Sequence, residues 1–177
     1  MTITTSSTNT TLNYPMEFES PSEATIKENA RYITEFMEIK VKFIDFSHVF
    51  GQRSFWMIDH DSKPVDNRYF DCPVSFTSEE DCLESFIHSS RYHESFDWLM
   101  TVVDKIESMP PLPIWPHSKF RVLIKNNVCQ IDVGENTIGV DGTFFVSGTN
   151  KLIATYHAVK IFINWYNKVV TGWIGIS

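Results

Sequence analysis

The sequence has few cysteines and no long apolar run. Three cysteines occur in 177 residues: Cys72, Cys82 and Cys129. A secreted disulfide scaffold of this size usually carries an even and larger number, so the count argues against that class and predicts reduced thiols. No stretch approaches the ~18 uninterrupted apolar residues of a membrane span. These absences predict a soluble protein that does not cross a membrane.

The N-terminal residues also show no secretory signal. Residues 1–13 are rich in Thr, Ser and Asn and contain no apolar run. A signal peptide needs an apolar stretch of roughly 7–15 residues, so we expect a cytoplasmic protein. Because residues 1–13 offer little surface to bury, we expect a flexible N-terminal tail followed by a single domain over residues 14–177.

Basic residues are outnumbered by acidic ones, 15 to 22, and the formal net charge is -7. The acidic excess lies in residues 1–109, with 19 acidic and 9 basic residues, whereas residues 110–177 hold 3 acidic and 6 basic residues. A chain this acidic repels a polyanion at long range, so we expect no nucleic-acid partner. A protein partner, above all a cationic one, and self-association both stay open.

Apolar residues make up 42% of the sequence, which is enough to build a core. Apolar residues at helical spacing predict three main helices, over residues 21–38, 94–108 and 149–170. Ser20 is the predicted N-cap of the first helix, and the proline after it suits the first helical position. A shorter helix is predicted to begin after Ser78, which can cap it.

Alternation with a period of two residues predicts several strands. We expect two short strands around a turn within residues 41–58, and a hairpin over residues 119–133. This hairpin turns at Asn126-Asn127, because Asn tolerates positive φ. The turn predicts a register that places six apolar residues on one face. The expected pairs are Ile124 with Cys129, Val122 with Ile131, and Phe120 with Val133.

A second hairpin is expected around Asp141-Gly142. Together these elements predict an α+β fold with helices packed on one face of an antiparallel sheet. The sheet comes from residues 119–147, and the strands near 41–58 could join it. The last helix is more apolar than one stripe requires, so we expect it to share a core with the 119–133 hairpin.

Three segments of the sequence occur together: Ile33-Thr34-Glu35-Phe36-Met37; the run from Tyr92-His93-Glu94-Ser95-Phe96-Asp97-Trp98-Leu99-Met100 to Glu107; and Ala158-Val159 with Phe162 to Asn167. In this combination the chain resembles a family of small uncharacterised proteins of phages and Bacteroidetes-type bacterial genomes. The family has no known activity, so the resemblance implies no catalytic residue. It implies a phage or bacterial cytoplasmic setting. Residues 41–90 are longer than the family's link, so a function particular to this chain is expected there.

Four potential zinc ligands lie within 22 positions: Cys72, Cys82, His88 and His93. Zinc accepts two thiolates and two imidazoles in a tetrahedron. The spacing between the cysteines is wider than in the usual C-x2-4-C knuckle, which favours a packed Cys82 and ordinary histidines. Zinc is therefore the alternative, in a hydrolase or in a structural site, and no other cofactor is expected.

Three further motifs have a chemical and a structural interpretation. Tyr92-His93-Glu94 could supply a general base, but no nucleophile can be paired with it, and Glu94 and Asp97 also suit the start of a helix. Asp59-His60-Asp61 with Asp66 could hold a hard cation, or form an exposed acidic turn. The P-x-x-P segment 110–116 could be read by a polyproline-binding domain, or serve as a stiff connector.

Lys119, Arg121 and Lys125 share one strand face, which could contact phosphates. The face has no interleaved aromatic residues, and the predicted register puts Arg121 opposite Asp132, so a solvated face is favoured. We predict no catalytic residue. The sequence as a whole favours a small, acidic, non-enzymatic protein-binding or accessory protein of phage or mobile-element type.

Overall fold

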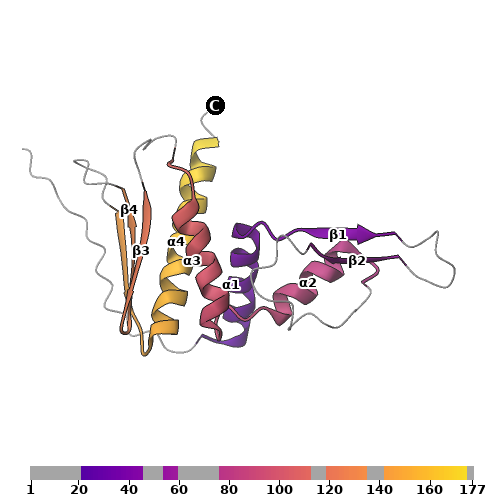
Figure 1. The fold of residues 1–177 in the computed structure, drawn as a ribbon, viewed down its shortest axis with the longest axis horizontal. Helices are drawn as coiled ribbons and strands as arrows, with labels where there is room; N and C mark the ends of the chain where they lie inside the picture. The colour runs from indigo at the N-terminus through magenta and orange to yellow at the C-terminus, as the bar shows by residue number, and fades with distance from the viewer. Residues whose placement is uncertain (1–20, 46–53, 60–75, 113–118, 135–141, 175–177) are drawn as a thin grey trace, which may run out of the picture. The chain divides into compact units, whose positions relative to one another are not determined.

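The computed structural model describes residues 21–45, 54–59, 76–112, 119–134 and 142–174. These residues contain four helices and two small antiparallel sheets, which confirms the predicted α+β class (Figure 1). They fall into two compact units, one of residues 21–102 and one that begins at Val103. None of the described helices combines the length and hydropathy needed to cross a membrane. The predicted tail lies outside these residues, and folding of both units as one domain stays a prediction.

The first unit contains α1 (Glu23–Phe36), β1 (Val41–Ile44), β2 (Phe55–Ile58) and α2 (Glu79–Ser89). The helix α2 packs against α1 and against both strands. The strands pair antiparallel, from Val41 opposite Ile58 to Ile44 opposite Phe55, as the alternation predicted. They form a sheet of their own instead of joining the larger sheet.

The two helices of this unit differ in how well their starts were predicted. Ser78 caps α2 as expected, because its Oγ accepts a hydrogen bond from the Asp81 amide at 3.1 Å. In α1 the cap is Ser22 and not Ser20: its Oγ accepts from the Thr25 amide at 3.3 Å. Both serines are suitable capping residues, but a cap at Ser22 places the acidic Glu23 in the first helical turn, where the helix dipole favours it.

The helix α3 (Phe96–Ser108) crosses the boundary between the units and begins two residues later than predicted. Its predicted apolar stripe is confirmed, since Leu99, Val102, Val103 and Ile106 are all buried. In its last turn, a Glu107 carboxylate oxygen accepts a hydrogen bond from the backbone N–H of Val122, at 2.9 Å. This bond places an acidic side chain at the outer edge of the sheet described next.

The second unit holds a three-stranded sheet of β3 (Phe120–Lys125), β4 (Val128–Val133) and β5 (Gly142–Ser147), in that order. All three predicted apolar pairs of the first hairpin are present, and Arg121 lies opposite Asp132. The turn residue Asn126 has a φ of 54°, which an Asn tolerates better than most residues. The pairing of β4 with β5 confirms a second hairpin, but its predicted position is wrong, because Gly142 is the first residue of β5 and lies opposite Val133 instead of forming the turn.

The helix α4 (Lys151–Ile174) packs against all three strands and covers one face of the sheet (Figure 1). Phe162 is fully buried, with its ring centroid 5.5 Å from that of Phe120 and 6.0 Å from that of Phe144. The predicted common core of the last helix and the hairpin is therefore confirmed. Successive side chains of a strand point to opposite faces of the sheet. The residues of β3, β4 and β5 that do not face α4 therefore lie on the other face.

Candidate functional site

Two of the predicted zinc ligands, His88 and His93, line one groove beside α1 and α2. The groove has a volume of about 470 Å³, and its other lining residues include Glu23, Lys27 and Ser90. Ser90 is buried and its hydroxyl donates to the carbonyl of Ile87 at 2.8 Å. The groove therefore presents two imidazoles and one ammonium group beside the first turn of α1.

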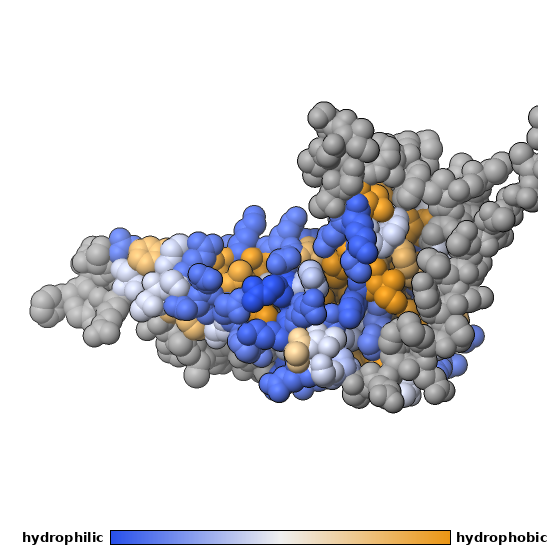
Figure 2. Space-filling view, turned by 180° about the vertical axis from the view of Figure 1, so that it is seen from behind, coloured by the Kyte–Doolittle hydropathy of each residue, from blue (hydrophilic) through white to orange (hydrophobic). Residues whose placement is uncertain are grey.

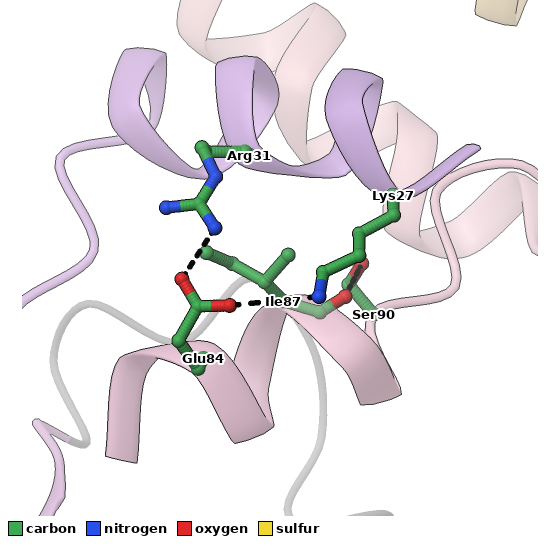
Figure 3. Close-up of polar contacts among 5 residues, drawn as sticks. All are labelled: Lys27, Arg31, Glu84, Ile87 and Ser90. Atoms are coloured by element: carbon green, nitrogen blue, oxygen red, sulfur yellow. Dashed lines mark hydrogen bonds and ion pairs between the residues drawn. The ribbon is translucent and has the colours of Figure 1, made fainter. Parts of the chain in front are cut away.

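Ion pairs between α1 and α2 lie next to this groove (Figure 3). Lys27 and Arg31 are one helical turn apart on α1, and both point toward Glu84 of α2. The Lys27 nitrogen lies 3.8 Å from a Glu84 oxygen, and Arg31 donates to the other oxygen. These side chains are partly exposed, so each pair contributes at most about 1 kcal/mol. Glu84 offsets the charge of Lys27 and weakens any attraction of the groove for anions.

Of the other two predicted zinc ligands, Cys82 is described and does not line the groove. Cys82 is 1% exposed and packs with the apolar face of α2. Burial, and to a smaller extent the charge of Glu79, raise the pKa of its thiol to about 11, which disfavours the thiolate that zinc binds. Cys72 lies outside the described residues. Within the described part of the chain, no three His, Cys, Asp or Glu side chains gather as a metal site.

The motif Tyr92-His93-Glu94 turns out to be a short turn before α3. Tyr92 is buried against Trp98, with ring centroids 5.1 Å apart, and Glu94 pairs with Arg91 at 3.1 Å. Asp97 lies in the first turn of α3, as predicted, whereas Glu94 precedes that helix. Through Tyr92 the motif thus contributes to packing, and it precedes α3 in the described structure.

The remaining motifs are described in part. Asp59 forms an ion pair with Lys42 at 2.9 Å, and the rest of the predicted acidic cluster, His60, Asp61 and Asp66, lies outside the described residues. The P-x-x-P segment is described as far as Leu112, which is buried. The third cysteine, Cys129, is fully buried in the core of the second unit, and burial raises the pKa of its thiol to about 12. Neither described cysteine is therefore poised to react.

On the face of the three-stranded sheet opposite α4, one row across the strands has an apolar side chain at each end and a Gln between them; we call it the apolar row. Leu123 of β3 lies opposite Gln130 of β4, which lies opposite Phe145 of β5. Leu123 is 56% exposed and Phe145 is 38% exposed. We call the surface formed by this row and its two neighbouring rows the open face. Elsewhere on the described part, apolar residues also reach the surface between hydrophilic ones (Figure 2).

In the two rows next to the apolar row, the residues contributed by β3 and β5 are polar or charged. One row contains Arg121, Asp132 and Thr143, and the other contains Lys125, Val128 and Ser147. Asp132 accepts hydrogen bonds from the Gln130 amide at 2.8 Å and from the Thr143 hydroxyl at 3.1 Å. The carboxylate of the open face is thus engaged across β4 and β5, while the exposed cations lie along β3.

Sequence reasoning identified the cations of this face but missed its two exposed apolar side chains. The signals were present. Leu123 falls in the polar phase of the alternation between Arg121 and Lys125. The adjacent pair Phe144-Phe145 must place one ring on each side of a strand, because neighbouring side chains point to opposite faces.

Comparisons of this chain with known protein families, with curated proteins and with solved structures find no match.

Proposed function

We propose that this chain is a small non-enzymatic protein-binding or accessory protein, and that it binds through the open face. The observation that carries the proposal is the pair of exposed apolar side chains, Leu123 and Phe145, held in one row of a sheet. Scattered apolar residues on a surface are ordinary, but two exposed apolar side chains in one row of a sheet, bordered by polar residues, are similar in composition to a protein interface.

A second exposed aromatic group supports binding less well. Phe43 of β1 is 50% exposed, and its ring lies 5.3 Å from that of Trp56. The chain that follows this strand lies outside the described residues, so the surroundings of Phe43 are incomplete. The open face, in contrast, is formed by three strands, and the register of both strand pairs is described.

The setting of this function follows from the resemblance given above. We propose a phage or mobile-element protein that works in the cytoplasm of a bacterial host, without nucleic acid or membrane as its partner. The formal net charge of -7 supports the exclusion of nucleic acid, because it opposes binding of a polyanion.

The proposal can be tested by selecting peptides from a displayed random library on the purified full chain. We expect the selected peptides to lose binding to the double variant Leu123→Ser/Phe145→Ser and to keep it for Tyr32→Ser. Tyr32 is a matched control, because it is an exposed aromatic residue of α1 that is 46% exposed. Both variants should remain folded, since the altered side chains are partly exposed, and circular dichroism checks this. Peptides that bind the double variant as well as the wild type would refute the proposed surface.

Zinc binding, in a hydrolase or in a structural site, is a second candidate. One observation favours it: His88 and His93, five residues apart in the sequence, line the same groove. Elemental analysis of protein purified without chelator should then show near-stoichiometric zinc, which the variant His88→Ala/His93→Ala would lose. The variant Cys129→Ala is the control, because this cysteine lies in the other unit. Zinc that is absent from wild-type protein, or unchanged in the histidine variant, would dismiss this candidate.

A further inference from the structure

The two outer edges of the three-stranded sheet differ in what the described residues place on them. The strand order makes β3 one edge and β5 the other. At β3, the Glu107 carboxylate accepts a hydrogen bond from the outward N–H of Val122, at 2.9 Å. The capacity of β5 to pair with a further strand depends on which of its own backbone groups point outward.

A hydrogen bond at the end of β5 establishes the direction of these groups. The Gly148 N–H donates to the Asn127 carbonyl at 2.9 Å, one position beyond the pair of Val128 and Ser147. Successive residues of an antiparallel strand direct their N–H and C=O alternately toward one neighbouring strand and away from it. Every second residue of β5 therefore directs its backbone groups away from β4. These outward residues are Thr143, Phe145 and Ser147.

The opposite side of the sheet shows the same alternation. The Gly134 N–H donates to the Lys119 carbonyl at 3.2 Å, one position beyond the pair of Phe120 and Val133. Counted from this bond, Val122 directs its N–H away from β4, which is where Glu107 meets it. Within the described part of the chain, no backbone hydrogen bond joins the outward groups of β5 to another element. Between the two edges of the described sheet, β5 is thus the one suited to strand addition.

We propose that the outer edge of β5 pairs with the same strand of a second copy of this chain, antiparallel about a twofold axis at Phe145. In this register Phe145 lies opposite Phe145 of the second copy, and Thr143 lies opposite Ser147. All three outward residues then face outward residues, and each pair exchanges two N–H···O bonds. A shift by one residue would set outward groups opposite inward ones. The inference goes beyond the proposed protein-binding function and does not depend on it.

The side chains of β5 suit pairing with a copy of themselves. The strand from Gly142 to Ser147 contains no charged residue, so two copies do not repel each other there. Phe145 is 38% exposed, and pairs of aromatic residues or of hydroxyl residues across two strands are favourable. The apolar row ends at Phe145 and would continue into the same row of the second copy. An interface that uses the same edge on both copies closes as a dimer.

The first experiment changes the side chain at the proposed twofold axis. In Phe145→Lys two ammonium groups would face each other, and in Phe145→Glu two carboxylates, and both variants lose the aromatic pair. Sedimentation equilibrium of the full chain, from about 1 µM to about 1 mM, measures the dissociation constant. We expect a dimer of the wild type and a dissociation constant about tenfold larger in each variant. Circular dichroism checks that both variants fold.

A mixture of the two variants is the sharper test, because Lys at position 145 of one copy then faces Glu at position 145 of the other. The mixture should form heterodimers about tenfold more tightly than either variant pairs with itself. This gain should shrink as salt is added. Leu123→Lys and Leu123→Glu are the matched controls, because Leu123 lies at the far end of the apolar row, on β3. They should dimerise like the wild type and gain nothing when mixed.

The variant Ser147→Pro tests the backbone bonds separately from the side chains. Proline has no N–H, and at this position the missing group points away from β4, so the sheet within one copy keeps its own bonds. Twofold symmetry removes one bond at each end of the interface. The variant should therefore remain folded and dimerise about tenfold more weakly.

Three outcomes would overturn the inference. A wild type that stays monomeric at about 1 mM would reject the dimer and leave the proposed function standing, since peptide binding to the open face is measured separately. Dimers weakened equally by Phe145→Lys and Leu123→Lys would place the second copy on the open face instead of at the edge. A monomeric wild type whose selected peptides lose binding to Ser147→Pro would assign the edge to an extended segment of another protein. Peptides that ignore the open face, with dimers that respond as expected, would refute the proposed function alone.

Discussion

Replacement of Phe162 by Ala should lower the free energy of unfolding by about 3–5 kcal/mol, because the variant loses a fully buried ring and leaves a cavity. Phe162 of α4 contacts the rings of Phe120 and Phe144, so it joins the helix to two strands of the sheet. A domain is typically stable by ~5–15 kcal/mol, so the loss would be a large share of the total. Urea unfolding followed by tryptophan fluorescence measures it.

Phe145→Ala is the matched control, because it removes the same ring from the open face of a neighbouring strand. Its effect should be well below that of Phe162→Ala, since Phe145 is 38% exposed. The double variant Phe120→Ala/Phe162→Ala should also depart from additivity by about 0.5 kcal/mol or more, as expected for side chains in contact. Additive effects, or equal losses for the buried and exposed rings, would contradict the described packing.

Acidification should destabilise the second unit through His157. This residue of α4 is 7% exposed, and burial, aided by the charge of Lys160, lowers its pKa to about 4 from an ordinary value of 6.5. Between these two values the unfolded chain binds the proton and the folded chain does not. Stability is therefore complete above the ordinary pKa, falls as the pH is lowered, and levels off below the folded pKa.

The expected loss from this residue is about 2–3 kcal/mol between neutral pH and about pH 4.5. Urea unfolding of the wild type and of His157→Gln at both pH values measures it. The loss of stability between the two pH values should be smaller in the variant by about this amount, because position 157 then has no imidazole to protonate. His88→Gln, at an exposed histidine of α2, is the control and should lose as much stability as the wild type when the pH is lowered. The same pH dependence in wild type and His157→Gln would show that another group is responsible.

Local chemistry made parts of the fold predictable. The register of β3 and β4 followed from one turn, because a two-residue loop at Asn126-Asn127 leaves a single pairing that gathers the apolar residues. The start of α2 followed from Ser78, whose side chain has a defined hydrogen-bonding role. In both cases the deciding interaction lies within a few residues along the sequence.

Features that depend on distant contacts were harder to predict. Alternation identified β1 and β2 as strands, but nothing in their own residues specified whether they would join the larger sheet. Ser20 and Ser22 are equivalent as capping residues, so the sequence could not decide between them. The exposure of Leu123 depends on which face α4 covers, and the pKa of Cys82 depends on burial by packing.

The bond between Glu107 and the edge of β3 bears on aggregation. An exposed strand edge is a template on which other chains can add strands, and native proteins commonly obstruct such edges with charged groups. The Glu107 carboxylate already accepts the hydrogen bond of the Val122 N–H. A strand added at this edge would first have to break that charge-assisted bond and leave the carboxylate buried without a partner. Glu107, in the last turn of α3, therefore disfavours the addition of strands from other chains at the edge of β3.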